Sequence, residues 1–501
     1  MRLSKYRNHL IFLGIGLVLL IAYFALRLPN LTLQPIFADE AIYVRWAQVM
    51  KAEPTLRFLP VTDGKTPLWM WILMPLFTFI SDPLLAGRLL SVFCGSLTLI
   101  GVLFLAWKYF NRGTGFWAGL LFVVTPYLVF FDRMALADSL LSAFSLWSLI
   151  FALLLVEYKR LDLAMILGGI LGGGWLTKTP GIFSVVSLPI ALISFQKWRK
   201  ERPEVYKILG LMLVSIVIAL GFYNILRLGP SFDSLSSRNG DYIHPLTHLL
   251  TSPFDPFIPH LRDLVEWFPK LITLPILGVI FGGIILAVFK WNRVALAIIG
   301  WSLFPLIVEM ALLRTFTTRY ILFTIPPLLF IGGWFIAEMI SRVGKHKVFL
   351  IGILLSLILV PTMLTNIKLL TNPETADLPR ETRRGYFEDW TAGQGLKEIA
   401  LFLQERAKER SVVVGTAGGF GTLPDGLFIY LDKAENISVV PGKSTISAEL
   451  KNAAKDHETY YVGSNSQFTP SDPSLSVVAE YKKVKGPDIE QDAMVLYRIN
   501  P

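Results

Sequence analysis

The sequence predicts an α-helical polytopic membrane protein with a small C-terminal α/β domain outside the membrane. Hydrophobic residues make up 53% of its 501 residues and charged residues only 17%, whereas about a quarter of the residues in soluble proteins are charged. Apolar runs of about 20 residues, the length that crosses a bilayer, recur along most of the chain. This composition excludes a soluble enzyme, a disordered scaffold and a nucleic-acid-binding protein.

Charge divides the chain into two predicted domains, residues 1–376 and 377–501. The C-terminal part carries 15 basic and 18 acidic residues, net −3, and the rest carries 32 and 19, net +13. In the C-terminal part, helical periodicity over 394–410 precedes five short β-rich runs, which together predict a small α/β domain. The runs are 411–415, 437–440, 460–463, 474–481 and 493–499.

Eleven apolar segments predict membrane spans. A twelfth stretch, 66–80, is shorter and carries two prolines, so we expect it to lie along the interface or to be re-entrant. The chain's single cysteine, Cys94, excludes an intramolecular disulfide. The predicted spans are 9–28, 84–107, 114–131, 134–156, 162–176, 179–195, 206–228, 271–290, 294–313, 320–341 and 347–368.

Basic loops fix the predicted orientation in the plasma membrane, because cytoplasmic loops are enriched in lysine and arginine. With a cytoplasmic N-terminus and eleven spans, five basic loops fall inside, and a twelfth span at 66–80 would place them all outside. The long loops 29–83 and 229–270 and the extracytoplasmic C-terminal domain then share the outer face. The inside loops are 108–112, 157–160, 196–207, 290–293 and 341–347.

The first outer loop carries three candidate site residues. Asp39 and Glu40 precede a stretch with helical periodicity, where acids stabilise a helix N-terminus or one of them serves as a catalytic base at the membrane surface. Lys65 lies before the apolar stretch 66–80. It either extends to the interface or holds a lipid phosphate as a point charge.

Charged residues at the outer ends of later spans form a second group. Asp132, Arg133 and Asp138 lie between two spans, where ionisable groups are paired or face a water-filled cavity. Lys178 lies in a glycine-rich turn between two short apolar segments, which is typical of broken helices that line a cavity but also of a simple hairpin.

Two further groups point to anions or metals. Arg319 and Tyr320, with the nearby Arg314, lie on the predicted outer side, where basic residues favour an anionic partner. His244 and His248 in the second long loop are candidates for a divalent metal. The histidine spacing fits no strong zinc pattern.

Taken together and in order, these elements resemble the GT-C superfamily of membrane glycosyltransferases. The closest resemblance is to the protein O-mannosyltransferases and the aminoarabinose (lipid A) transferases, and it covers most of residues 1–370. The elements that carry it are Asp39-Glu40, Lys65-x-Pro67-Leu68, residues 87–98, Arg133 with Asp138, Leu176-Thr177-Lys178-x-Pro180 and Arg319-Tyr320.

The resemblance implies an inverting transferase that moves a hexosyl or pentosyl group from a polyprenyl phosphate to a hydroxyl of a protein, lipid or glycan. In such enzymes the reaction takes place at the outer membrane face. Asp39 is implied as the base, with Glu40 beside it, and Asp138 as the residue that orients a substrate or assists a metal. Donor-phosphate binding is implied for Lys65, Arg133, Lys178, Arg319 and Tyr320.

Departures from the family pattern leave sugar and acceptor open. The chain lacks the His-Pro-Pro sequence and the large inserted lumenal domain of the eukaryotic protein mannosyltransferases. It has Lys65-Thr66-Pro67 where the aminoarabinose enzymes show Lys-Pro-Pro. Two alternatives stay open: a transporter or flippase for a lipid-linked precursor, which requires ionisable groups within the membrane, and an oligosaccharyltransferase or polysaccharide polymerase.

Overall fold

The computed structural model describes residues 2–196, 202–442, 445–468 and 472–501. Its contacts divide the chain into two compact units. The helical unit comprises Met1–Pro29, Phe58–Trp69 and Leu89–Thr371, and the C-terminal unit comprises Asn30–Arg57, Met70–Arg88 and Asn372–Pro501. The predicted domain boundary at residue 376 stays a prediction, and it lies four residues after the start of the last segment of the C-terminal unit.

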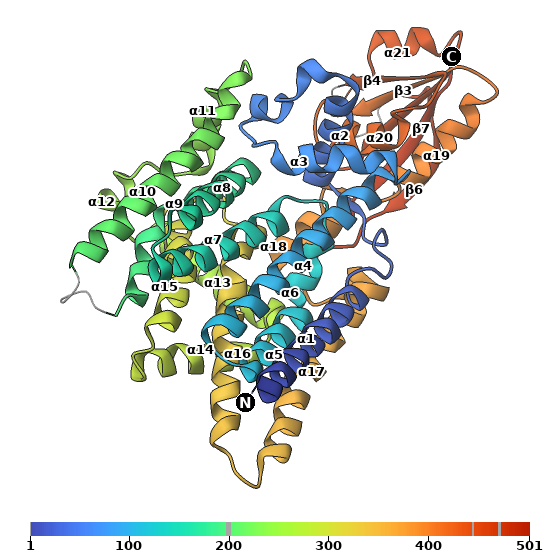
Figure 1. Ribbon diagram of the computed structural model, residues 1–501. Helices are drawn as coiled ribbons and strands as arrows, with labels where there is room; N and C mark the ends of the chain where they lie inside the picture. Colours follow the sequence, from blue (N-terminus) through green and yellow to red (C-terminus); the bar gives the residue numbers. More distant parts are fainter. Residues whose placement is uncertain (1, 197–201, 443–444, 469–471) are drawn as a thin grey trace. The chain divides into compact units, whose positions relative to one another are not determined.

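The helical unit is built from apolar helices (Figure 1). Within it, α8 packs against α7 and α10, and α16 packs against α5 and α14. Its helices are α1 (Arg2–Ala25), α4 (Pro83–Tyr109, which begins in the C-terminal unit), α5 (Arg112–Val124), α6 (Pro126–Asp132), α7 (Asp138–Tyr158), α8 (Leu161–Thr177), α9 (Ile182–Val186), α10 (Arg202–Asn224), α11 (Ser234–Tyr242), α12 (His248–Thr251), α13 (Phe257–Leu271), α14 (Leu274–Phe289), α15 (Arg293–Leu312), α16 (Ile325–Arg342) and α17 (Lys347–Thr371).

Among the described residues, six helices are long and apolar enough to cross a membrane, or eight if each of two bent helix pairs is one span. The α5–α6 pair bends by 60° and the α13–α14 pair by 116°. The first bend follows from Pro126, because the residue before a proline is driven out of the helical region, and Thr125 is extended with ψ 120°.

The eleven predicted spans all coincide with helices, but the number eleven is not confirmed, because several of these helices are short. Residues 162–176 and 179–195 fall on apolar helices of fewer than 18 residues. The stretch 66–80 forms α3 (Leu68–Leu73) and a 3₁₀ helix (Met74–Thr78). Together they are too short to cross a bilayer as one helix.

Several of the predicted inside loops lie at the same end of the helical unit, where their basic residues pair with acids on neighbouring helices. Lys108 at the end of α4 lies 2.7 Å from Glu157 at the end of α7, and Lys159 lies 3.0 Å from Glu204 at the start of α10. Lys290 after α14 pairs in the same way with Glu338 on α16. Residues 197–201 of the predicted loop 196–207 lie outside the described residues. The side of the membrane that these loops face stays a prediction.

The C-terminal unit contains a five-stranded sheet, as the β-rich runs predicted (Figure 1). The helical periodicity over 394–410 is also confirmed, by α19. The elements of this unit are β1 (Ile36–Phe37), α2 (Ala38–Ala52), α18 (Arg380–Arg383), β2 (Ala392–Gly393), α19 (Leu396–Ala407), β3 (Val412–Ala417), α20 (Thr422–Leu431), β4 (Ile437–Gly442), α21 (Ala448–Ala453), β5 (Glu458–Ser464), β6 (Leu475–Lys482) and β7 (Ala493–Ile499).

The sheet has the strand order β4-β3-β5-β7-β6, with β3 parallel to β4 and β5 and the last two pairings antiparallel. All seven residues of β5 are buried, as expected for a strand covered on both faces. Tyr460 packs against Phe402 of α19, whereas the next residue, Tyr461, belongs to a cluster with Leu450 of α21. Because successive side chains of a strand point to opposite faces, α19 and α21 cover opposite faces of the sheet.

Candidate active site

Three helix ends in the helical unit bring predicted site residues together. Asp138 is the first residue of α7, Lys178 directly follows α8, and Arg319 and Tyr320 lie in the 3₁₀ helix Thr318–Thr324 that precedes α16. A carboxylate in the first turn complements the partial positive charge of a helix N-terminus. The hydroxyl of Tyr127 on α6 donates to the carbonyl oxygen of Thr318, which ties the 3₁₀ helix to the bundle.

Lys178 is the centre of this cluster. Its Nζ lies 2.5 Å from Oδ1 of Asp138 and 4.7 Å from the centroid of the Tyr320 ring. The guanidinium of Arg319 lies 5.3 Å from the centroid of the same ring. The Lys178 side chain is 17% exposed and that of Asp138 only 4%. The cluster therefore combines two cations, one aromatic ring and one carboxylate, and Lys178 keeps some access to solvent or ligand.

Glu309 adds a second carboxylate close to this cluster. It lies near the end of α15, is 2% exposed, and interacts electrostatically with both Lys178 and Asp138. Its Oε2 atom makes no hydrogen bond to any described residue. An unsatisfied buried carboxylate oxygen is costly, which makes Glu309 a functional candidate in its own right.

Glycine permits the tight turn that carries Lys178. A Cβ atom on Gly181 would lie 2.3 Å from the carbonyl oxygen of Gly174, a distance that no side chain tolerates. The amide of Gly181 also donates to the carbonyl of Lys178. The close backbone packing expected from the glycine-rich sequence thus occurs at this position.

Arg133 lies in the helical unit, where its side chain binds backbone carbonyl oxygens. It is 4% exposed, and its Nη1 donates to the carbonyl oxygens of Arg27 and Pro29, both at 2.7 Å. These bonds hold the chain where it leaves α1. Its predicted part in phosphate binding stays a prediction.

A buried network that the sequence did not reveal lies beside Arg133. Arg27, fully buried, donates from Nε to Asp132 at 2.9 Å, and Asp132 also accepts from Ser139 at 2.8 Å and from Tyr23 at 3.2 Å. The pair joins residues 105 positions apart. Its only sequence signal is a charged residue at the end of an apolar run, which does not identify a partner.

Lys65 lies in a chain of charges that links the two predicted outer loops. Its Nζ is 2.6 Å from Asp63, and Asp63 is 3.0 Å from Arg238 of the second loop. Arg238 in turn pairs with Asp241 at 2.9 Å. The Lys65 side chain is 23% exposed, so its ammonium group is partly accessible to solvent or to a ligand.

The acidic pair Asp39-Glu40 lies in the first turn of α2, in the C-terminal unit, and its two members differ. Glu40 is fully buried: its two oxygens accept from Nε and Nη2 of Arg88 at 2.9 and 2.8 Å, and Oε2 also accepts from the amide of Phe37 at 3.0 Å. Arg88 further donates to three backbone carbonyls between residues 31 and 35. Asp39 is only half-buried.

The predicted metal ligands do not form a metal site. His244 and His248 stack with ring centroids 4.1 Å apart, and the ring of His248 contacts the backbone carbonyl of Asp255. Burial and the neighbouring His248 lower the pKa of His244. In the described ranges, no three His, Cys, Asp or Glu side chains come close enough to hold a metal.

Part of the sequence matches a family model, and the fold matches solved structures. Residues 64–222 match the family described as dolichyl-phosphate-mannose-protein mannosyltransferase, and this stretch contains Lys65, Arg133, Asp138 and Lys178. The fold is similar to that of ArnT from Cupriavidus metallidurans bound to undecaprenyl phosphate, with a TM-score of 0.60 and 15% identity over 97% of both chains. The chain shares the fold of these membrane glycosyltransferases.

Further solved structures share this fold. ArnT in its apo state matches with a TM-score of 0.56 and 16% identity, over 99% of this chain and 98% of that chain. The archaeal oligosaccharyltransferase AglB from Archaeoglobus fulgidus matches with a TM-score of 0.54 and 10% identity, over 90% of this chain and 69% of that chain. No curated protein sequence matches. The GT-C fold, a multi-pass helical membrane domain with a small sheet domain, is therefore confirmed.

Proposed function

We propose that this protein is an inverting glycosyltransferase that moves a sugar from a polyprenyl phosphate to a hydroxyl group at the outer membrane face. The acceptor is a protein, a lipid or a glycan. The observation that carries the proposal is the Lys178 cluster, a partly accessible cation beside Asp138, Arg319 and Tyr320 in a GT-C fold. ArnT, whose fold is similar, was solved with undecaprenyl phosphate bound, which supports this class of donor.

The cluster suits a phosphate leaving group. As the bond between the anomeric carbon and the phosphate oxygen breaks, its electron pair stays on that oxygen, and negative charge grows there. Cations already in place near that charge lower the barrier, because they need no reorganisation during the reaction. Lys178 and Arg319 supply this charge, with Lys65 as a further cation, and Asp138 holds Lys178 in position.

Asp39 is the base in this proposal. It takes the proton of the acceptor hydroxyl as the hydroxyl oxygen attacks the anomeric carbon from the side opposite the phosphate. One step therefore exchanges the bond to phosphate for a bond to the acceptor and inverts the configuration. The contacts of Glu40 support the choice of Asp39, because both oxygens of Glu40 are committed to Arg88 whereas Asp39 is half-buried.

A complementation experiment tests the proposed transfer reaction and does not require that the sugar be known. Cells that lack the gene receive the wild-type chain, Asp39→Asn, or the control Asp456→Asn, which neutralises an exposed aspartate of the same unit. Mass spectrometry of envelope lipids and glycoproteins is expected to show one modification that wild type and control restore and Asp39→Asn does not. Restoration by Asp39→Asn at equal membrane yield would eliminate Asp39 as the base.

We also propose a cytoplasmic N-terminus, basic loops inside and the C-terminal unit outside. The single buried cysteine makes this measurable. In a Cys94→Ser background, one cysteine placed at exposed Glu449 is expected to react with a membrane-impermeant maleimide in intact cells, whereas one placed at exposed Arg160 reacts only after lysis. The reverse labelling pattern would overturn the orientation.

Glu309 supports one alternative function, a flippase for a lipid-linked precursor. An acid within a membrane span with an unsatisfied oxygen is typical of transport paths. Transport of a fluorescent polyprenyl-phosphate lipid across proteoliposomes, lost in Glu309→Gln and kept in Asp39→Asn, would favour the flippase. The opposite result favours the transferase. Transfer of a preassembled glycan, as by an oligosaccharyltransferase, would appear as a larger mass in the complementation experiment.

A further inference from the structure

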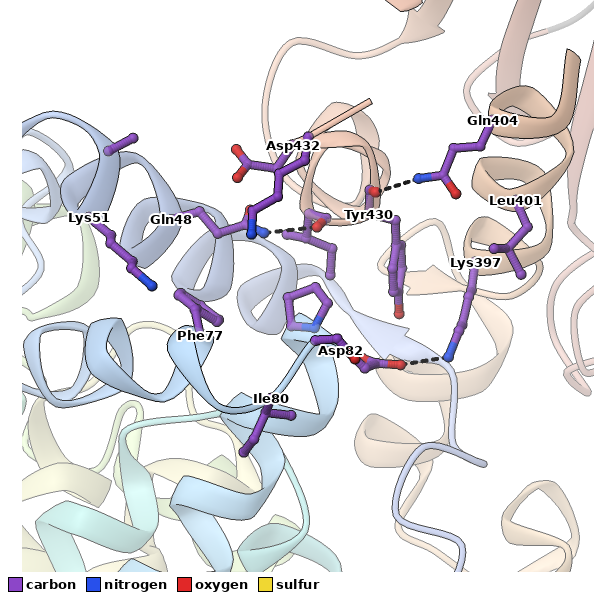
Figure 2. A pocket seen from close by; sticks show the side chains of 15 residues that line it. Gln48, Lys51, Phe77, Ile80, Asp82, Lys397, Leu401, Gln404, Tyr430 and Asp432 are labelled. Atoms are coloured by element: carbon purple, nitrogen blue, oxygen red, sulfur yellow. Dashed lines mark hydrogen bonds and ion pairs between the residues drawn. The ribbon is translucent and has the colours of Figure 1, made fainter. Parts of the chain in front are cut away.

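The C-terminal unit contains a pocket to which the proposed reaction assigns no role. Its volume is about 660 Å³, within the range of small-molecule sites. Four elements of this unit line it: α2, the segment from the 3₁₀ helix Met74–Thr78 to the start of α4, α19 and α20 (Figure 2). A pocket of this size between elements far apart in sequence suits a specific ligand.

Hydrogen bonds between side chains and helix backbone hold the walls together. Gln48 on α2 donates from Nε2 to the carbonyl oxygen of Ile429 at 2.8 Å, and Gln404 on α19 donates to that of Tyr430 at 2.9 Å (Figure 2). These bonds attach α2 and α19 to α20 on either side. The pocket is therefore largely pre-formed, which reduces the conformational entropy that a ligand must overcome.

Three lysines and two aspartates give the pocket an excess of positive charge. Lys397 lies 2.6 Å from Asp82, and Asp432 pairs with Arg45. The two carboxylates are thus already matched by cations.

The other two lysines, Lys51 and Lys433, do not pair with a carboxylate among the described residues. Lys51 donates to the hydroxyl of Thr78 at 3.0 Å. In Figure 2, Lys51 and Lys397 lie on opposite sides of the pocket.

The rest of the lining is suited to hydroxyl groups and to the apolar face of a ring. Tyr430 contributes a hydroxyl, and burial together with nearby Asp82 raises its pKa, so the hydroxyl keeps its proton at neutral pH. Phe77, Ile80 and Leu401 add apolar surface. A simple inorganic anion would leave this surface unused, and an apolar ligand would leave the lysines and aspartates unmatched.

We propose that this pocket binds an anionic saccharide. Its carboxylate or phosphate group contacts Lys51 and Lys433, its hydroxyls donate to Asp82 and accept from Tyr430, and its ring packs on Phe77. A free sugar acid and the headgroup of a glycolipid share this chemistry. The site goes beyond the proposed transfer reaction, and binding to it requires no turnover.

Binding to the purified full-length chain in nanodiscs of phosphatidylcholine tests the proposal. Isothermal titration compares glucuronate with glucose, which differ in charge, and with inorganic phosphate. Glucuronate is expected to bind, glucose to bind at least roughly tenfold more weakly because it lacks the charged contact, and phosphate to bind more weakly than glucuronate. A second arm incorporates glucuronosyl diacylglycerol into the nanodiscs. If the lipid is the source, it displaces glucuronate, and if the free sugar is the source, it does not.

Variants locate the site. Lys51→Ala and Lys433→Ala are each expected to weaken glucuronate binding by roughly tenfold, the effect of losing one charged hydrogen bond. Lys455→Ala removes the same charge from the end of α21, away from the pocket lining, and is expected to bind as wild type does. Tyr430→Phe keeps the ring and weakens binding through the lost hydroxyl. No detectable binding, equal binding of phosphate, or an equal loss in Lys455→Ala would overturn the proposal.

Discussion

Replacing Glu40 by glutamine is expected to destabilise the C-terminal unit, whereas replacing its half-buried neighbour Asp39 by asparagine is expected to lower stability much less. Glu40 and Arg88 are both fully buried and joined by two hydrogen bonds of 2.9 and 2.8 Å. Neutralising one partner of a buried ion pair leaves the other charge uncompensated, at a cost of about 3–5 kcal/mol. Arg88 keeps its three bonds to backbone carbonyls in this variant, so we expect the lower end of that range.

Thermal unfolding measures this difference. About 3 kcal/mol corresponds to a Tm lowered by about 6–12 °C for a unit of 150–250 residues. Tryptophan fluorescence of the purified chain reports the transition, and hydrogen exchange of peptides from residues 30–52 locates it. Glu40→Gln is expected to increase exchange there, because Arg88 no longer fixes both this backbone and α2.

A double variant separates loss of the pair from a general effect of substitution at this position. In Glu40→Met/Arg88→Met neither charge of the pair stays buried, so the double variant is expected to lose less stability than Glu40→Met and Arg88→Met together. The reasoning would be wrong if Glu40→Gln unfolded at the wild-type temperature, or if Asp39→Asn lowered Tm as much as Glu40→Gln does. The second result would make both acids structural and would remove the support for Asp39 as the base.

Three further predictions follow from single contacts. Lys65→Ala is expected to weaken undecaprenyl phosphate binding several-fold through the loss of a partly exposed cation, while Lys65→Arg restores most of it; equal affinity of all three chains would exclude Lys65 from the phosphate site. Gly95→Ala is expected to lower Tm markedly, since a Cβ atom there would lie 2.6 Å from the Asp132 carboxylate. An unchanged Tm would show that the side chains of the Asp132 network can move to accommodate the added atom. A hydrogen bond from Lys451 lowers the pKa of Asp472 to about 2, so its stabilisation is present above the unfolded pKa and is lost as pH falls towards 2. Asp472→Asn should therefore lower Tm at pH 6 but not near pH 2, and a difference that persists in acid would contradict the pairing.

The local elements were predictable because their signals are local. Apolar runs long enough to cross a bilayer predicted the helices of the helical unit, and β-branched runs predicted all five strands of the sheet in the C-terminal unit. Bent spans were not predicted. The break at Thr125 has a signal in Pro126, and the 116° bend between α13 and α14 lies between Pro269 and Pro275, a local signal that the predicted spans did not use.

The candidate site was predictable in its residue types but not in its contacts. The order of acids and lysines along the sequence indicated the candidate residues, because charged groups at span ends are costly unless they are paired or functional. Their partners were not predictable: Asp138 pairs with Lys178, forty positions away, and Arg133 holds backbone carbonyls. Arg27 was missed altogether, since a charge at the end of a span is usually placed at the interface.

From sequence alone, the chain is predicted to be a membrane protein that resembles the GT-C enzymes, because hydropathy and charge act residue by residue along the chain. The tertiary structure alone separated the two adjacent acids, since only the fold brings Arg88 to Glu40 across 48 positions and leaves Asp39 half-buried. Burial and hydrogen-bond partners are properties of the folded chain, and they decide that Glu40 is held by Arg88 inside the C-terminal unit.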